Sequence, residues 1–179
     1  MDERKCVLTA FGVIWVVGLG VGMQILFDYE NSSGPPATPP LVWPANSQLQ
    51  RAQGGPTLVV IAQPHCPCTR ATIGELALIM ARLQHQVSAT VVFSRPRGAS
   101  EDWEDTDLWH SAAAIPGVIV MHDVGAVEAA RFDASVSGQT LLYDASGRLV
   151  FGGAITASRG HPGRAEIISL VTQRTGEQY

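Results

Sequence analysis

The chain has 179 residues, of which only 16% are charged against about 25% in ordinary soluble domains, and its formal net charge is −4. The arginines are scattered singly and Lys5 is the only lysine, so no basic patch indicates a nucleic-acid partner, and P-loop or lysine Schiff-base chemistry is excluded. Three cysteines are too few for a disulfide scaffold or a four-thiolate zinc site.

The first segment is expected to be a membrane anchor. Residues 6–27, CVLTAFGVIWVVGLGVGMQILF, carry no charge, and a helix of that length spans about 33 Å, enough to cross a bilayer. Arg4 and Lys5 precede the segment and acidic residues follow it, which predicts residues 1–5 in the cytoplasm and the rest outside. A cleaved signal peptide is the competing interpretation, although such peptides have shorter apolar cores. We expect a single-pass signal anchor in the inner (cytoplasmic) membrane with a periplasmic or other extracytoplasmic domain.

Residues 28–56 are expected to form a linker. The stretch 31–56 holds six of the chain's eleven prolines among Gly, Ser, Asn and Gln, so it is predicted to bury too little apolar surface to fold. We therefore expect an extended, semi-rigid stalk that ends where a folded domain of residues 57–179 begins.

In residues 57–179, strands and helices alternate. The continuous apolar run 57–62 is typical of a strand buried on both faces. Periodicity and turn residues then predict helices at 69–84, 100–114, 124–132 and 164–174, and strands at 87–94, 118–121, 139–143 and 149–152. The acidic residues of 101–107 are expected on a solvated face. This order predicts an α/β fold, a mixed central sheet with helices on both faces, as in a thioredoxin-like domain with an insertion in the middle.

The strongest chemical signal is QPHCPCTR at residues 63–70, where the first strand meets the first helix. If Cys66 is the N-cap, Pro67 falls at the first helical position, which accepts proline. The positive helix end then favours a thiolate on Cys66, the nucleophile of disulfide exchange, and Cys68 is the natural resolving thiol. The Cα atoms of residues two positions apart in a helix lie about 5.5 Å from each other, so Cys66 and Cys68 are within disulfide range. Their Cβ vectors diverge, which predicts a strained and easily reduced bridge.

Together with the terminal hairpin, these residues resemble the membrane-anchored thioredoxin-like proteins of bacterial envelopes, the TlpA and ResA type. LVVIAQPHCPC matches the active-site turn of that family, and QTLLYDASGRLVFGG matches its hairpin. HCPCTRA, LLYDASGRL and GGAITASRGH are also similar to the smaller RedB group. The resemblance implies thiol–disulfide oxidoreduction, protein thiols and disulfides or a membrane-bound electron donor as partners, and no cofactor beyond a redox-active disulfide.

The chain departs from the family pattern at two places. The family motif is C-x-x-C, and one residue is missing here. The family also has a cis-proline before the hairpin, and alignment puts Gly138 at that position. We expect a trans, flexible peptide at Gly138 and expect proline there to be tolerated, whereas a positive φ would make proline destabilising. Because the cis-proline helps the family to repel metal, its absence opens a Cu(I) site as an alternative.

Further residues are candidates for auxiliary roles. His65 adjoins Cys66, while Arg159 and His161 lie in a loop predicted at the same sheet edge, where either is expected to stabilise a thiolate, assist proton transfer or simply occupy a solvated turn. The rival function is a copper chaperone or sensor that binds Cu(I) through Cys66, Cys68 and a histidine, His161 or His65. A third is a binding module without redox turnover.

Overall fold

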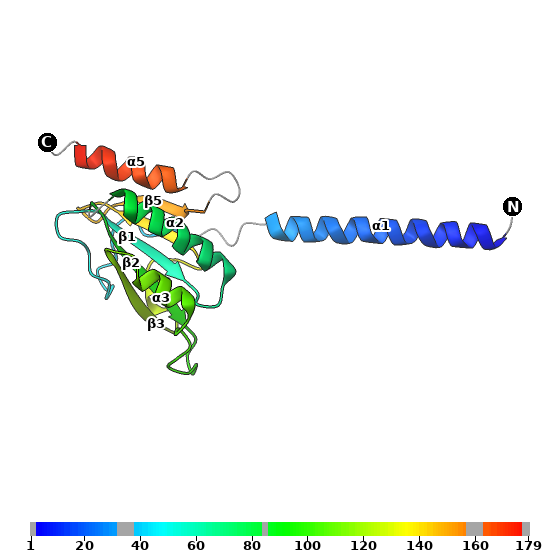
Figure 1. Ribbon diagram of the computed structural model, residues 1–179, viewed down its shortest axis with the longest axis horizontal. Coiled ribbons are helices and arrows are strands. Elements are labelled where there is room, and N and C mark those ends of the chain that lie inside the picture. Colours follow the sequence, from blue (N-terminus) through cyan, green and yellow to red (C-terminus); the bar gives the residue numbers. More distant parts are fainter. Residues whose placement is uncertain (1–2, 32–37, 84–85, 157–162, 177–179) are drawn as a thin grey trace. The chain divides into compact units, whose positions relative to one another are not determined.

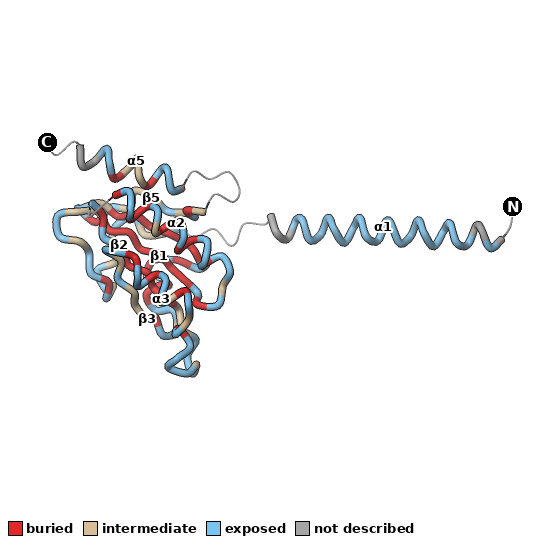
Figure 2. Tube along the Cα trace, viewed as in Figure 1, coloured by how far each residue is buried: buried red, intermediate tan, exposed pale blue. Residues whose placement is uncertain are grey.

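The computed structural model describes residues 3–31, 38–83, 86–156 and 163–176, in two units that comprise residues 1–36 and 37–179 (Figure 1). The first unit holds α1 (Glu3–Asn31), whose described side chains are exposed (Figure 2). Within α1, Val7–Asp28 has a mean hydropathy of 2.0 and is long and apolar enough to cross a membrane, a criterion that a signal sequence also meets. The helix extends beyond the predicted 6–27 because neither its charged flanks nor any proline interrupts it.

The second unit is built on a five-stranded mixed sheet with the strand order β3-β2-β1-β4-β5. β1 pairs in parallel with β2 and β2 with β3, whereas β4 runs antiparallel to both β1 and β5. The strands are β1 (Thr57–Ala62), β2 (Ser88–Arg95), β3 (Val118–Val124), β4 (Gln139–Tyr143) and β5 (Leu149–Ala154). The helices are α2 (Pro67–Leu83), α3 (Asp107–Ala113), α4 (Val127–Arg131) and α5 (Gly163–Gly176). The predicted α/β architecture is confirmed.

The alternation of side chains along β1 divides the core into two layers. Leu58 and Val60 face a cluster that includes side chains of α2, α3 and α5, while Val59 and Ile61 face a second cluster on the other side of the sheet. All six residues of β1 are buried, as the continuous apolar run predicts, and Figure 2 shows buried residues along the central strands. The end of β1 is therefore held rigidly at the centre of the sheet, directly before the cysteines.

The helix predicted at 100–114 begins later than expected. α3 starts at Asp107, after Thr106, whose side chain accepts a hydrogen bond from the backbone N–H of Trp109 at 3.3 Å. Ser100 therefore does not cap this helix, because a threonine next to the apolar stretch provides the N-cap. The residues between β2 and α3 form an irregular loop, defined here as the insertion loop, residues 96–106.

The prediction of a stalk is wrong for residues 38–56, which pack against the domain and are called the strap. Trp43 contacts two aromatic side chains, with ring centroids 5.2 Å from Phe132 and 5.1 Å from Tyr143. Backbone hydrogen bonds join the strap to the β4–β5 hairpin, from Trp43 N to Gly147 O at 2.8 Å and from Leu149 N to Leu41 O at 2.8 Å. The strap lies on the sheet face opposite α2, where α4 is too short to cover the apolar side chains.

Polar contacts also fix the strap in position. The carboxylate of Glu128, buried on α4, accepts hydrogen bonds from Ser47 Oγ at 2.7 Å and from the backbone N–H of Gln48 at 3.0 Å. The phenol of Tyr143 donates to the Pro40 carbonyl oxygen at 3.0 Å. Burial raises the pKa of Tyr143 to about 12, so this donor keeps its proton through the physiological pH range. The strap thus folds despite its proline-rich composition, because the domain supplies the apolar surface and the hydrogen-bond partners.

Replacing Trp43 with alanine is expected to destabilise the second unit by about 2–3 kcal/mol, because the half-buried indole fills the space between Phe132 and Tyr143. Urea unfolding of the full chain in detergent measures the loss. Trp103→Ala is the matched control, since Trp103 is 37% exposed on the insertion loop, and it should cost less than about 1 kcal/mol. Equal, small losses in both variants would mean that the strap does not stabilise the domain.

Candidate functional site

Cys66 and Cys68 form a disulfide at the point where β1 leads into α2. Their Cα atoms lie 5.4 Å apart, so a two-residue spacing lets the bridge close. Pro67 is the first residue of α2, as predicted, and places Cys66 directly before the helix. Cys66 is half-buried and Cys68 is exposed, so a partner molecule can approach the disulfide from solvent.

Two hydroxyl groups beside the disulfide, those of Thr69 and Ser137, bind the backbone of Gln63. Thr69 Oγ1 donates to Gln63 O at 2.8 Å, and the Gln63 N–H is shared between Thr69 Oγ1 at 3.2 Å and Ser137 Oγ at 3.1 Å. The two hydroxyl oxygens lie 2.7 Å apart. Ser137 O lies 3.9 Å from Cys68 Sγ. Sequence reasoning did not select Thr69 or Ser137, because nothing in their local sequence shows that the fold brings them together.

Gly138 lies next to this group and corrects an expectation. Its φ is +87°, whereas proline needs φ near −65°. Its N–H donates to Ile61 O at 2.7 Å, and proline has no N–H to make this hydrogen bond. A Cβ at this position would lie 2.7 Å from Thr72 Oγ1. The expectation that proline is tolerated at 138 is therefore wrong, because the close approach of this loop to β1 and α2 requires glycine.

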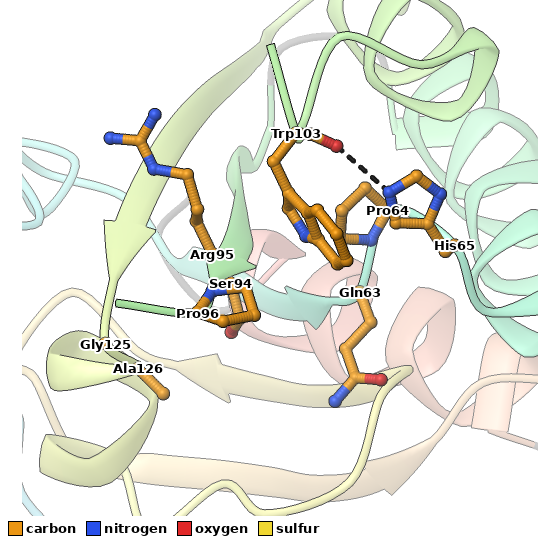
Figure 3. A pocket seen from close by; sticks show the side chains of 9 residues that line it. All are labelled: Gln63, Pro64, His65, Ser94, Arg95, Pro96, Trp103, Gly125 and Ala126. Atoms are coloured by element: carbon orange, nitrogen blue, oxygen red, sulfur yellow. Dashed lines mark hydrogen bonds between the residues drawn. The ribbon is translucent and has the colours of Figure 1, made fainter. Parts of the chain in front are cut away.

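A pocket of about 420 Å³ opens at the carboxyl ends of β1, β2 and β3, next to the turn that leads to Cys66 (Figure 3). Its wall includes the three residues before Cys66 and the indole of Trp103 from the insertion loop. His65 Nε2 lies 3.1 Å from Trp103 O, so this nitrogen carries the proton and donates, while the two rings meet edge to face at 4.6 Å. The lining residues are Gln63, Pro64, His65, Ser94, Arg95, Pro96, Trp103, Gly125 and Ala126.

One residue of the acidic stretch is buried, contrary to the expectation of a solvated face. The Glu104 side chain is 0% exposed and lies 3.5 Å from Arg95 Nη1 and 3.4 Å from His122 Nδ1. The imidazole of His122 in turn stacks on Trp109, with ring centroids 4.2 Å apart. Neither carboxylate oxygen of Glu104 has a hydrogen-bond partner among the described residues, so the guanidinium of Arg95 is the positive group that offsets the burial of this side chain. The spacing of charges in the sequence does not reveal which of several acidic residues turns inward.

Two of the predicted auxiliary residues, Arg159 and His161, lie outside the described residues. Within the described ranges, no group of three His, Cys, Asp or Glu side chains is arranged to hold a metal ion. The Cu(I) set of Cys66, Cys68 and His161 therefore stays a prediction, as does the role of Arg159. Of the predicted site residues, the structure brings together Cys66, Pro67, Cys68, His65 and Gly138 around the β1–α2 turn.

Comparison of the whole chain with known proteins identifies the fold. No protein-family model matches the chain, and no curated protein sequence matches it. Several solved structures do match the chain. A secreted disulfide oxidoreductase from Mycobacterium tuberculosis, homologous to DsbE of Escherichia coli, superposes with a TM-score of 0.50 at 18% identity, over 68% of this chain and 83% of that one. The fold is thioredoxin-like.

Two further thioredoxin structures agree. The exposed lipoprotein thioredoxin Etrx1 from Streptococcus pneumoniae strain TIGR4 has a TM-score of 0.52 at 14% identity, over 68% of this chain and 86% of that one. A thioredoxin-like protein in its oxidised form has a TM-score of 0.53 at 17% identity, over 76% and 94% of the two chains. At such identities the similarity establishes the thioredoxin-like fold, and the chemistry must be argued from the site.

Proposed function

We propose that this chain is a thiol–disulfide oxidoreductase whose active site is the Cys66–Cys68 pair. The observation that carries the proposal is the disulfide itself, which is accessible, closed over one residue and located at the start of α2 in a thioredoxin-like fold. The amides and the positive end of a 17-residue helix favour negative charge on the sulfur that precedes it. Structural neighbours that carry out disulfide oxidoreduction support the same chemistry.

The exchange proceeds in two balanced steps. In the dithiol form, the Cys66 thiolate attacks one sulfur of a substrate disulfide, so a mixed disulfide forms and the other substrate sulfur leaves as a thiolate that takes up a proton. Cys68 then loses its proton, attacks Cys66 Sγ and releases the second substrate thiol. The chain has given two electrons and holds the Cys66–Cys68 disulfide. A substrate or donor dithiol reverses both steps and reduces the chain again.

The anchor and the compartment belong to the same proposal. The length and hydropathy of Val7–Asp28 support a membrane-tethered protein, and the basic residues Arg4 and Lys5 before it support an extracytoplasmic domain. Disulfide chemistry is favoured in such oxidising compartments. Protein thiols and disulfides are the proposed substrates, a membrane-bound donor is the proposed electron partner, and membership of the RedB group stays a prediction from the HCPCTRA segment.

The pocket beside the disulfide supports a polypeptide substrate. Pro64, Pro96 and the indole of Trp103 give it apolar walls, and Gln63 and Ser94 supply polar groups, so a side chain near the reacting cysteine of a polypeptide has a place to bind. A small dithiol has no polypeptide side chain to place in this space.

Replacing Trp103 with alanine is expected to raise KM for a peptide disulfide about tenfold and to leave the reaction with dithiothreitol unchanged, because the variant removes an apolar wall and spares the cysteines. Steady-state kinetics of the full chain in detergent, with both substrates, measure the two effects. Leu78→Ala serves as the control, since Leu78 is an exposed apolar residue of α2 that does not line the pocket. Equal KM values for Trp103→Ala and Leu78→Ala would exclude the pocket as a substrate site.

The reduction potential of the purified full chain, determined with and without Cu(I), tests the proposed function. We expect a reversible two-electron couple in a dithiothreitol redox buffer, in which the ratio of oxidised to reduced protein changes tenfold for about every 30 mV. Alkylation of the two thiols followed by mass measurement reports the oxidised fraction. Tight Cu(I) binding with no measurable couple would instead support the copper chaperone or sensor, and absence of both would support a binding module without turnover.

A further inference from the structure

The carbonyl group of Ser137 faces the second cysteine of the pair. Ser137 O lies 3.9 Å from Cys68 Sγ, on the loop that leads into β4. In the disulfide form this sulfur carries no hydrogen. After reduction the Cys68 thiol has a hydrogen, and the Ser137 carbonyl oxygen is an acceptor within reach of it.

The hydroxyl groups of Ser137 and Thr69 hold this carbonyl in place. Thr69 Oγ1 has one hydrogen, which it donates to Gln63 O at 2.8 Å. In the 2.7 Å contact between the two hydroxyl oxygens, Ser137 must therefore donate and Thr69 accept. Thr69 is 1% exposed, so little water competes for its hydroxyl. We call the Thr69 and Ser137 hydroxyls with the Gln63 backbone the hydroxyl clamp.

We propose that Ser137 is a positioning residue that sets which cysteine ionises: its clamped carbonyl keeps the proton on reduced Cys68, so the thiolate forms on Cys66. A hydrogen bond to the neutral thiol, and the negative end of the carbonyl dipole, both disfavour a thiolate at Cys68. The start of α2 favours a thiolate at Cys66. The inference rests on the proposed function, in which Cys66 attacks first and Cys68 keeps its proton until the mixed disulfide has formed.

Alkylation of the two reduced cysteines by iodoacetamide tests the inference. Peptide mass spectrometry of the full chain in detergent gives the rate for each cysteine across a pH series. We expect Cys66 to react at least about tenfold faster than Cys68 at pH 7. In the disulfide form Cys68 is the more exposed of the two, so accessibility by itself predicts the opposite order.

Variants of the clamp separate positioning from simple structural support. Ser137→Ala and Thr69→Val should each lower the Cys66 to Cys68 rate ratio about three- to tenfold, mainly through faster reaction of Cys68 at lower pH, because each removes hydrogen bonds of the clamp that hold the Ser137 backbone in place. Ser137→Thr keeps the hydroxyl and should restore the wild-type ratio. Ser135→Ala, at an exposed position of the same loop, should leave it unchanged.

A wild-type chain in which Cys68 reacts as fast as Cys66 would overturn the inference, and so would either of two outcomes with the variants. One is a wild-type ratio and pH profile in both Ser137→Ala and Thr69→Val. The other is a lowered ratio that Ser137→Thr fails to restore and that Ser135→Ala shares, which is the behaviour of general loop destabilisation. Alkylation needs no substrate disulfide, so it is independent of exchange activity. If the chain shows the expected alkylation ratios but no disulfide exchange, the proposed function is wrong and the ionisation order still holds.

Discussion

Replacing Cys66 with serine is expected to reduce disulfide exchange to the rate measured without protein, because it removes the sulfur directly before α2 that is proposed as the nucleophile. The assay follows cleavage of a fluorescence-quenched peptide disulfide by dithiothreitol in the presence of the full chain. Cys6→Ser, which changes the first residue of the uncharged segment 6–27, should keep wild-type activity and controls for loss of a thiol as such.

The Cys68→Ser variant should fail at the next step. Its Cys66 can still attack, but no thiol remains to resolve the product, so the mixed disulfide with the peptide should accumulate in stoichiometric amount. Intact mass measurement under non-reducing conditions detects that adduct. Full activity in both Cys66→Ser and Cys68→Ser would rule out this mechanism, and adduct formation on Cys68 in the Cys66→Ser variant would reverse the assigned roles.

Replacing Gly138 with proline is expected to destabilise the second unit by about 3 kcal/mol or more. Proline requires φ near −65°, whereas Gly138 has φ of +87°, and the substitution also removes the N–H that donates to Ile61 O. The added side-chain atoms would collide with Thr72 Oγ1. Urea unfolding of the full chain measures the free energy of unfolding, and exchange activity should fall with the folded fraction.

Two alanine variants separate the causes of that loss. Gly98→Ala introduces a side chain at a φ of +82° with open space around it, so it reports the cost of the backbone conformation by itself, about 1–2 kcal/mol. Gly138→Ala adds the Thr72 collision to the same conformational cost and should lose more, though less than proline because it keeps the N–H. A Gly138→Pro variant as stable as wild type would contradict the left-handed conformation of this loop.

Local sequence patterns determined the elements that form the centre of the fold. The run Thr57–Ala62 is apolar on both sides of the strand, so burial on both faces follows from its composition wherever the rest of the chain packs. Proline directly after Cys66 determines where α2 begins, because only the first helical turn accepts it. The closing Asp-Ala-Ser-Gly turn likewise encodes the β4–β5 hairpin. The disulfide between Cys66 and Cys68 could also be predicted from the local sequence, because two cysteines separated by a single residue need no distant partner.

Only the tertiary structure decided the surroundings of the disulfide. Residues 38–56 have the composition of a linker and fold because Phe132, Tyr143 and Glu128 offer contacts that the segment lacks by itself. Ser137 and Thr69 are separated by 68 residues and meet only because β4 pairs with β1. Gly138 takes a left-handed φ because its loop passes between the end of β1 and α2. Short patterns record the local preferences of the backbone and the side chains, whereas these contacts join residues far apart in the chain, where pairing of the strands and close packing select the partners.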